Sequence, residues 1–194
     1  MTKHTTTLSV LVSGVPSRLA SGPPASLSAL WAQAGLFEDV EVLYLVDNKR
    51  RSVGEKRNAL LSIARGDYVS YVDDDDAVSD DYVSKLREAA VTGADVIVFP
   101  VRVTLNGQAE GVVEPSVREP VQEQYRPGAI TKRRPIQIAC WRRALVADIR
   151  FPDVQWGEDH AWGDLASARV QTEYRVDSVL YHYKYDESVS EAVR

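Results

Sequence analysis

The segment GDYVSYVDDDDAVSDDY, residues 66–82, places four consecutive carboxylates directly after an alternating apolar run: Asp73, Asp74, Asp75 and Asp76. Adjacent carboxylates repel one another by about 1 kcal/mol for each close pair even in bulk water. A bound cation, a helix N-terminus or simple solvation must therefore offset their charge. Because oxygen-only side chains suit hard divalent cations, the segment is interpreted either as a Mg²⁺ or Mn²⁺ site or as a solvated acidic turn.

Two further segments contain side chains that could do chemistry. In FPDVQWGEDHAW, Glu158 and Asp159 begin an expected helix, where they either favour the helix N-terminus or take part in proton transfer. In VLYHYKYDESVS, His182 and Lys184 alternate with tyrosines, so on a strand these two side chains share one face. A histidine in this position is either a ligand or a packed strand residue.

The apolar pattern predicts the elements that must position these residues. Strands are expected over residues 8–13, 40–46, 67–72 and 94–103, and helices over residues 24–36, 53–65 and 79–93. Ser79 would cap the third helix, with Asp80 and Asp81 in its first turn. This alternation predicts an α/β fold with a sheet covered on both faces. Asp73 would end the third strand, at the edge where such sheets bind ligands.

The pattern changes after residue 103. LNGQ predicts the turn of a hairpin, and residues 118–135 predict a long loop. PIQIACW predicts another strand, GEDHAWGDLASAR a short helix, and YRVDSVLYHYKY one or two late strands. With no internal repeat, one domain over residues 1–194 is expected.

Composition excludes several classes of protein. The chain has 194 residues, is 44% hydrophobic and 26% charged, and has a formal net charge of −5. This acidic total argues against a protein that binds nucleic acid over its whole surface. Cys140 is the only cysteine, so no intramolecular disulfide can form. Because no apolar run reaches the length of a signal peptide or a membrane span, we expect a soluble, cytoplasmic protein without a membrane partner.

The segment GEKRNALLSIARGDYVSYVDDDD resembles the G-x-x-x-A-R-N…A-x-G-x-Y-[apolar]₃-D-x-D-D pattern of family 2 glycosyltransferases. The positions that match are Gly54, Arg57, Asn58, Gly66, Tyr68, Asp73, Asp75 and Asp76. The resemblance implies the GT-A fold of nucleotide-diphospho-sugar transferases, a mostly parallel mixed sheet flanked by helices. It also implies that Asp75 contacts a divalent metal, Mn²⁺ or Mg²⁺. Asp73 would hold the nucleotide ribose or a metal-bound water, with Asp74 beside it at the nucleotide.

The later segments are similar to two further motifs of the family. FPDVQWGEDHAW matches its F-x-x-x-x-x-G-E-D segment, which implies that Asp159 is the general base and that Glu158 orients the acceptor or its loop. VLYHYKYDESVS resembles its closing Y-x-Y…S-x-S pattern. Through this resemblance His182 is expected to complete the metal shell, and Lys184 or Ser188 to meet the diphosphate.

The nucleotide end departs from the family pattern in two loops. Asp47 in YLVDNKRRS takes the place of the aspartate that reads the base, but DNKRRSV replaces the usual D-D-x-S-x-D run and SGVPSR the usual P-x-Y-N. Arg57, or Lys56 beside it, would neutralise the diphosphate, and UDP is the expected nucleotide. The resemblance divides the domain into a nucleotide-sugar-binding half, about residues 1–103, and an acceptor-binding half, about residues 104–194.

The implied reaction is inverting, metal-dependent transfer of a sugar from a UDP-sugar to an acceptor hydroxyl. One segment bears on the acceptor: YRPGAITKRRPIQIACWRR contains no acid and six basic residues, Arg126, Lys132, Arg133, Arg134, Arg142 and Arg143. Such a segment can hold phosphates or bases. Short phage enzymes of this kind glycosylate hydroxymethylated bases in DNA, so a nucleic-acid acceptor in a phage-infected host cell is one hypothesis. Arginines on an exposed loop are the alternative.

Three rival functions were weighed. A sugar-phosphate nucleotidyltransferase shares the sheet and the metal, but it needs a glycine-rich loop after the first strand, and SGVPSRLASG supplies Arg18 and few glycines. A D-x-D-x-[TV] phosphatase needs its motif on the first strand, and Ala77 stands where its Thr or Val belongs. A non-catalytic nucleotide-sugar-binding module would not require Asp75 and Asp159.

Overall fold

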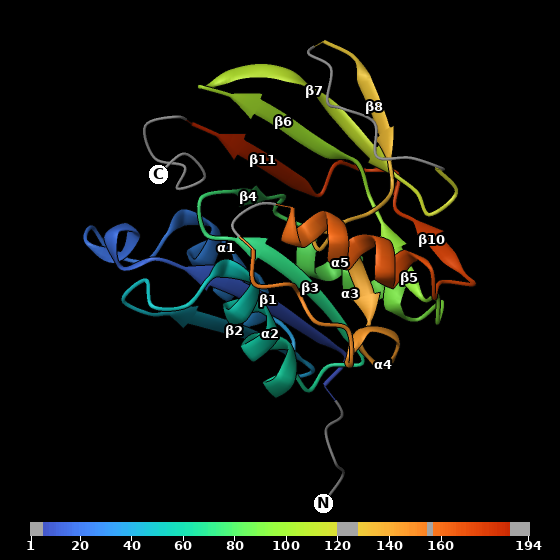
Figure 1. Cartoon of the computed structure of the whole chain (residues 1–194), viewed down its shortest axis with the longest axis horizontal. Helices are drawn as coiled ribbons and strands as arrows, with labels where there is room; N and C mark the ends of the chain where they lie inside the picture. The colour runs from blue at the N-terminus through green and yellow to red at the C-terminus, as the bar shows by residue number, and fades with distance from the viewer. Residues whose placement is uncertain (1–5, 120–127, 155–156, 187–194) are drawn as a thin grey trace, which may run out of the picture.

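The computed structural model describes residues 6–119, 128–154 and 157–186, which form two sheets and the helices around them (Figure 1). The larger sheet has the order β10-β5-β9-β3-β1-β2. Its strands are β1 (Leu8–Gly14), β2 (Val40–Val46), β3 (Tyr68–Asp73), β5 (Val96–Val98), β9 (Cys140–Arg142) and β10 (Glu173–Arg175). β1 runs parallel to both β2 and β3, whereas β9 is antiparallel to β3 and β5. The prediction of a mostly parallel mixed sheet is confirmed.

Helices cover both faces of this sheet, because alternate residues of its central strands are buried on opposite sides. The helices are α1 (Ala25–Ala34), α2 (Val53–Ile63), α3 (Tyr82–Ala90), α4 (Arg143–Val146) and α5 (Glu158–Ser167), with a 3₁₀ turn, η1, at Pro16–Leu19. Val10 of β1 packs in one core with Leu30 of α1 and Leu86 of α3. Leu11 packs in the other core with Leu60 of α2 and Trp162 of α5. Each such buried side chain contributes about 1.5–3 kcal/mol.

The smaller sheet has the order β4-β11-β6-β7-β8. Its strands are β4 (Ala77–Val78), β6 (Val101–Leu105), β7 (Gln108–Pro115), β8 (Ile130–Arg133) and β11 (Tyr181–Tyr185). β6 and β7 form the hairpin that LNGQ predicts, with positive φ angles of 48° at Asn106 and 78° at Gly107. Two such residues in succession match the type I′ turn that joins twisted strands. In Figure 1 this sheet lies above the larger one, and α5 lies near their junction.

Two predicted strands and one predicted loop differ from the structure. Residues 94–103 do not form one strand, because the chain leaves the larger sheet after Val98 and enters the smaller sheet at Val101. Pro100 lies at this break, and proline has no N–H to donate to a ladder. Of PIQIACW, only Cys140 and Trp141 lie in a strand. The loop expected over residues 118–135 contains β8, and residues 120–127 lie outside the described part.

The predicted start of the third helix is also wrong. α3 begins at Tyr82, and no acidic residue lies in its first turn. The N–H of Ser79 donates to the carbonyl of Leu180, and the Ser79 hydroxyl donates to Asp81 at 2.8 Å. Ser79 is thus bonded to the chain just before β11 and does not cap the helix. The carboxylates that precede α3 are therefore stabilised by groups other than its N-terminus.

Among the described residues, no helix is long and apolar enough to cross a membrane.

Candidate active site

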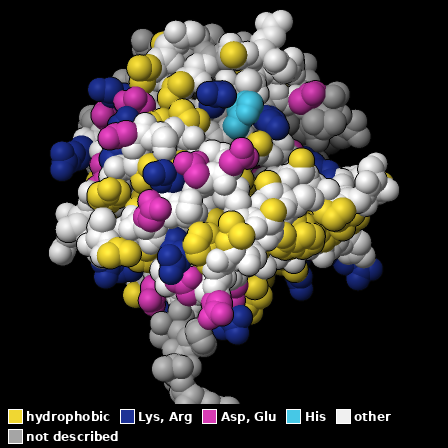
Figure 2. All heavy atoms as spheres, turned by 180° about the vertical axis from the view of Figure 1, so that it is seen from behind, with side chains coloured by type: hydrophobic (Ala, Val, Ile, Leu, Met, Phe, Trp, Pro, Cys, Tyr) yellow, Lys and Arg dark blue, Asp and Glu magenta, His cyan; other side chains and the backbone are white. Residues whose placement is uncertain are grey.

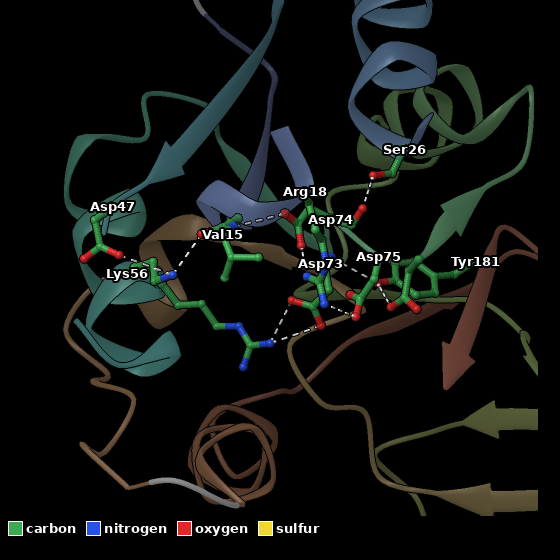
Figure 3. Close-up of polar contacts among 12 residues, drawn as sticks. Val15, Arg18, Ser26, Asp47, Lys56, Asp73, Asp74, Asp75 and Tyr181 are labelled. Atoms are coloured by element: carbon green, nitrogen blue, oxygen red, sulfur yellow. Dashed lines mark hydrogen bonds and ion pairs between the residues drawn. The ribbon is translucent and has the colours of Figure 1, made fainter. Parts of the chain in front are cut away.

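The candidate site lies at the carboxyl edge of the larger sheet, where β1, β2 and β3 end together. Their register pairs Ser13 with Asp73 and Gly14 with Val46, so Asp47, the next residue after β2, lies at the same edge as Asp73. Figure 3 shows Asp47 and Lys56 on one side of this edge and Asp73, Asp74 and Asp75 on the other. Sequence positions 47 and 73 are brought together because parallel strands share one carboxyl edge.

Arg57 joins the end of β3 to the start of α5. From α2, its guanidinium forms ion pairs with Asp73 at 2.9 Å and with Glu158 at 2.8 Å, and only 4% of its side chain is exposed. It also lies over the ring of Phe151, 5.5 Å from its centre. Burial alone would lower the pKa of Arg57, but the carboxylates of Asp73 and Glu158 raise it. Arg57 therefore remains charged and holds the two predicted acidic clusters together.

The neighbouring Asn58 strengthens the same junction. Its side-chain amide donates to the Phe151 carbonyl at 2.9 Å, and its side-chain oxygen accepts from the Phe151 N–H at 2.9 Å. Gly54, one turn earlier on α2, lies against this segment as well, since a Cβ there would be 2.8 Å from the Pro152 carbonyl oxygen. The three matching positions of the GEKRN motif thus all contact α5 or the chain that leads into it.

Arg18, which the sequence did not single out for this site, binds two of the four aspartates. It projects from η1, directly after β1, and forms ion pairs with Asp74 and, at 2.7 Å, with Asp75 (Figure 3). Asp74 also accepts a hydrogen bond from the N–H of Val15 at 3.2 Å, and its carbonyl accepts one from the hydroxyl of Ser26 at 3.0 Å. These contacts connect the segment after β1 with the D-x-D segment, Asp73 to Asp75. A basic residue just after the first strand was the only signal for this contact.

Asp76 has a structural part in the site. Its buried carboxylate accepts from the Tyr181 hydroxyl at 2.5 Å and from the Lys184 N–H at 2.7 Å. The Tyr181 oxygen in turn accepts from the N–H of Asp73 at 3.1 Å. These bonds fix β11 against the acidic segment. Lys184, predicted to meet the diphosphate, contributes its backbone here, and its side chain is exposed.

Burial raises the pKa of three acidic groups of the site, Asp74, Asp75 and Glu158. Burial and the neighbouring Asp73 charge raise the pKa of Asp75 to about 6, although Arg18 acts in the opposite direction. Burial also raises the pKa of Asp74, again opposed by Arg18. The same cause raises the pKa of Glu158, with Arg57 opposing it. A carboxylate cluster that is destabilised by burial attracts a further cation.

Asp47 shapes the loop that follows β2. Its carboxylate accepts from the N–H groups of Lys49 at 3.1 Å and Arg51 at 3.0 Å, and it lies 3.6 Å from the Lys56 ammonium. Lys56 also donates to the carbonyl of Gly14 at 2.9 Å, and its side chain is only 6% exposed. Lys56 is thus held between the ends of β1 and β2.

Asp159 lies on the first turn of α5, next to Glu158. Its carboxylate accepts the N–H of His160 at 2.8 Å, and no ion pair involves Asp159 within residues 6–119, 128–154 and 157–186. Its charge raises the pKa of Arg57 and, with the charges of Asp73 and Asp75, that of Tyr183. Asp159 therefore acts on the same region as the acidic cluster while its carboxylate remains half-buried.

His182 stays a predicted metal ligand, and in the structure its ring contacts the neighbouring strand. Its Nε2 lies 3.1 Å from the hydroxyl of Thr104 on the adjacent strand β6. Burial lowers its pKa, and the charges of Lys184 and Arg102 add to this effect. In the described part of the chain, no three His, Cys, Asp or Glu side chains are arranged so that they could hold a metal ion.

The fold and this edge of acids define an α/β protein with the GT-A fold of nucleotide-sugar transferases. A family model described as glycosyl transferase family 2 matches residues 28–142, more than half of the chain. The chain belongs to glycosyltransferase family 2. No curated protein matches it.

Solved structures agree on the fold. S. aureus TarS 1–349 in complex with UDP superposes with a TM-score of 0.66 at 19% identity, over 92% of this chain and 60% of that chain. The complex of TarS 1–349 with UDP-GlcNAc superposes with a TM-score of 0.64 at 16% identity, over 95% of this chain and 61% of that chain. Glucosyl-3-phosphoglycerate synthase from Mycobacterium tuberculosis, in complex with Mn²⁺, UDP and glucosyl-3-phosphoglycerate, superposes with a TM-score of 0.57 at 15% identity. The match covers 91% of this chain and 71% of that chain. The chain spans about three fifths of the TarS 1–349 structures.

Replacing Arg57 by methionine should lower the free energy of unfolding by about 3–5 kcal/mol, because Asp73 and Glu158 would lose their buried partner. Urea unfolding at neutral pH measures this change. The matched control is Arg65→Ala, which removes an ion pair with Glu41 from a side chain that is 75% exposed. That variant should lose less than about 1 kcal/mol. Equal losses in both variants would contradict the proposed importance of the Arg57 junction.

Replacing Asp75 by asparagine should stabilise the protein at neutral pH by about 1–2 kcal/mol, because it removes a charge that burial disfavours. Since the pKa of Asp75 is raised to about 6, its protonation stabilises the fold at low pH, and this benefit is lost as pH rises through about 6. The gain of Asp75→Asn over wild type should therefore vanish near pH 4 and be complete by pH 7. Urea unfolding across this range measures it. Asp177→Asn, at a side chain that is 94% exposed, is the control.

Proposed function

We propose that the chain is an inverting, metal-dependent glycosyltransferase that moves a sugar from a UDP-sugar to an acceptor hydroxyl. The observation that carries the proposal is the Arg57 junction, which brings the D-x-D segment and the start of α5 to one place. Membership of family 2 supports glycosyl transfer over nucleotidyl transfer and over a binding module. The nucleotide is inferred from structural neighbours that are complexes with UDP and UDP-GlcNAc.

The acidic cluster fits a divalent cation. Asp73 and Asp75 offer only carboxylate oxygens, and the pKa of Asp75, raised by burial and by Asp73, indicates that positive charge is insufficient there. We assign Asp73 and Asp75 to the cation, Mn²⁺ or Mg²⁺, with Asp74 beside them. When bound, the ion would stabilise the charge of the leaving diphosphate. His182 would join this set only after losing its bond to Thr104.

The other site residues have separate parts in the proposed reaction. Asp159 takes the proton of the acceptor hydroxyl as its oxygen attacks the anomeric carbon from the face opposite the leaving UDP. Glu158, held by Arg57, positions Asp159. Asp47 lies where the base would bind, and its loop is held by Lys56. Arg18 and Lys56 bring positive charge to the diphosphate side of the sheet edge, and Lys184 lies on β11 beside it.

The division of labour between the halves is part of this proposal. Residues 1–103 include β1, β2 and β3, at whose carboxyl ends the proposed donor site lies, and residues 104–194 include α5 with the proposed base. A DNA acceptor stays a prediction. Three of the six basic residues of its segment bind within the protein: Arg134 pairs with Asp164, Arg142 with Asp95, and Arg143 donates to the Gly66 carbonyl.

The surface gives this acceptor little support. On the face of the molecule shown in Figure 2, lysine and arginine side chains are interspersed with acidic ones. A nucleic-acid partner favours a continuous basic stripe, which that face lacks.

Calorimetric titration of the protein with UDP, GDP and TDP tests the donor. UDP should bind with Mn²⁺ or Mg²⁺ present and should bind much more weakly once the metal is chelated, because the cluster alone repels a diphosphate. The same titrations with chelator are the control. Binding of GDP or TDP in preference to UDP would contradict the assignment of the base at Asp47. No binding of any of the three would contradict the proposed donor class.

Replacing Asp159 by asparagine should lower transfer by about 10²–10⁴-fold while UDP affinity stays unchanged, because the amide cannot accept the proton. Release of UDP from UDP-glucose, UDP-galactose and UDP-GlcNAc, with water or added alcohols as acceptors, measures this. Asp164→Asn on the same helix, at a side chain that is 47% exposed, is the matched control and should keep full activity. Retained activity in Asp159→Asn would overturn the assignment of the base.

A further inference from the structure

Arg133 lies on the inner face of the smaller sheet. In β8, Thr131 is 1% exposed and Ile130 is 61% exposed, so the strand turns one face inward and the other to solvent. Arg133 is two residues from Thr131 and shares its inward face. It pairs in register with Pro115 of β7, and its side chain is half-buried. The sequence left open that this arginine belongs to an exposed loop, but it belongs to a strand that packs against the protein.

Arg133 differs from its neighbouring arginines in its ion pairs. Its neighbour Arg134 forms an ion pair with Asp164, and Arg142 lies 3.4 Å from Asp95. Within the described residues, no carboxylate forms an ion pair with Arg133. Burial lowers the pKa of Arg133, and the charge of Asp159 opposes this from a distance. Holding this charge at a half-buried position costs more stability than holding it on a solvated loop.

The surroundings of Arg133 include a small hollow and the proposed base. The hollow has apolar walls from Phe99, Val101, Val113 and Ile136, and Arg133 lines it. Asp159 lies on α5, the helix that the neighbouring Arg134 contacts through its ion pair with Asp164. Arg133 therefore brings a guanidinium, a planar fork of N–H donors, to the part of the smaller sheet that adjoins α5 through the ion pair of Arg134 with Asp164.

We propose that Arg133 binds an anionic oxygen group, a phosphate or a carboxylate, that the sugar acceptor carries near its reacting hydroxyl. A guanidinium offers two parallel N–H donors to such a group. The anion would pair with the charge of Arg133, and the acceptor hydroxyl would be directed towards Asp159. This inference rests on the proposed function, because it names the class of acceptor for that site.

Equilibrium dialysis with labelled inorganic phosphate and, separately, labelled acetate tests the anion site. The protein is first saturated with UDP and Mg²⁺, so that free anion cannot occupy the diphosphate position. Wild type should bind one anion saturably, and Arg133→Gln should bind it at least about tenfold more weakly, as expected for a lost charge-assisted hydrogen bond. Arg134→Gln, which removes the adjacent and already paired arginine, should bind as wild type does.

Preference for phosphate over acetate would identify a phosphate-bearing acceptor, and the reverse would identify a carboxylate. Equal binding by wild type and Arg133→Gln, or no saturable binding of either anion by wild type, would overturn the proposal. Equal weakening in Arg134→Gln would also overturn it, since a general loss of positive charge would then explain the result.

Folding and the donor are checked separately. Arg133→Gln removes an uncompensated cation, so its thermal unfolding midpoint should not fall below that of wild type. If it does, Arg133→Lys decides the question: it keeps the charge, and it should bind phosphate more weakly than wild type because the fork is lost. Labelled UDP is dialysed in parallel. Arg133-dependent anion binding without UDP binding would refute the donor while the anion site stands, and UDP binding without anion binding would refute only the anion site.

Discussion

The ion pairs of Arg57 are the constraint on which the rest of the site depends. One guanidinium, almost wholly buried, contacts Asp73 at the end of β3 and Glu158 at the start of α5. Neither carboxylate could be buried there without a cation, because an unpaired buried charge costs several kcal/mol. The distance between Asp73 and Glu158 is therefore set by the span of one side chain. Asn58, through its two bonds with Phe151, holds the segment before α5 against α2.

The four consecutive aspartates are tolerated because each has a partner outside the segment. Asp73 pairs with Arg57, Asp74 and Asp75 pair with Arg18, and Asp76 bonds to Tyr181 and to the N–H of Lys184. The N-terminus of the next helix, which the sequence favoured as one source of stabilisation, begins only at Tyr82. The negative charge of the four aspartates is thus compensated by groups from α2, η1 and β11. The pKa of Asp75 remains raised, which favours the binding of a cation there.

The sequence predicted what depends on local pattern and missed what depends on distant contacts. Buried strands, the hairpin at Asn106 and Gly107, and the position of Asp73 follow from periodicity and turn chemistry. Arg18 was missed because its partners lie 56 and 57 residues away. The break at Pro100 was missed because a continuous apolar run gives no sign that the chain changes sheets. The metal role of His182 is carried over from a motif and stays a prediction, and its ring contacts Thr104 in the structure.

Asp75 and Arg133 lie at separate places in the fold, an arrangement that suits a cation at one of them and an anion at the other. Asp75 is an acid whose pKa burial raises, and Arg133 is a base whose pKa burial lowers, so both hold charge at a cost. They cannot neutralise each other, because Asp75 follows a strand of the larger sheet and is paired with Arg18, whereas Arg133 belongs to the smaller sheet. A cation with its nucleotide would bind at Asp75, and an anionic acceptor would bind at Arg133. Asp159, on the helix joined to both regions, would then have its charge balanced on the acceptor side by Arg133 while its carboxylate remained able to accept a proton.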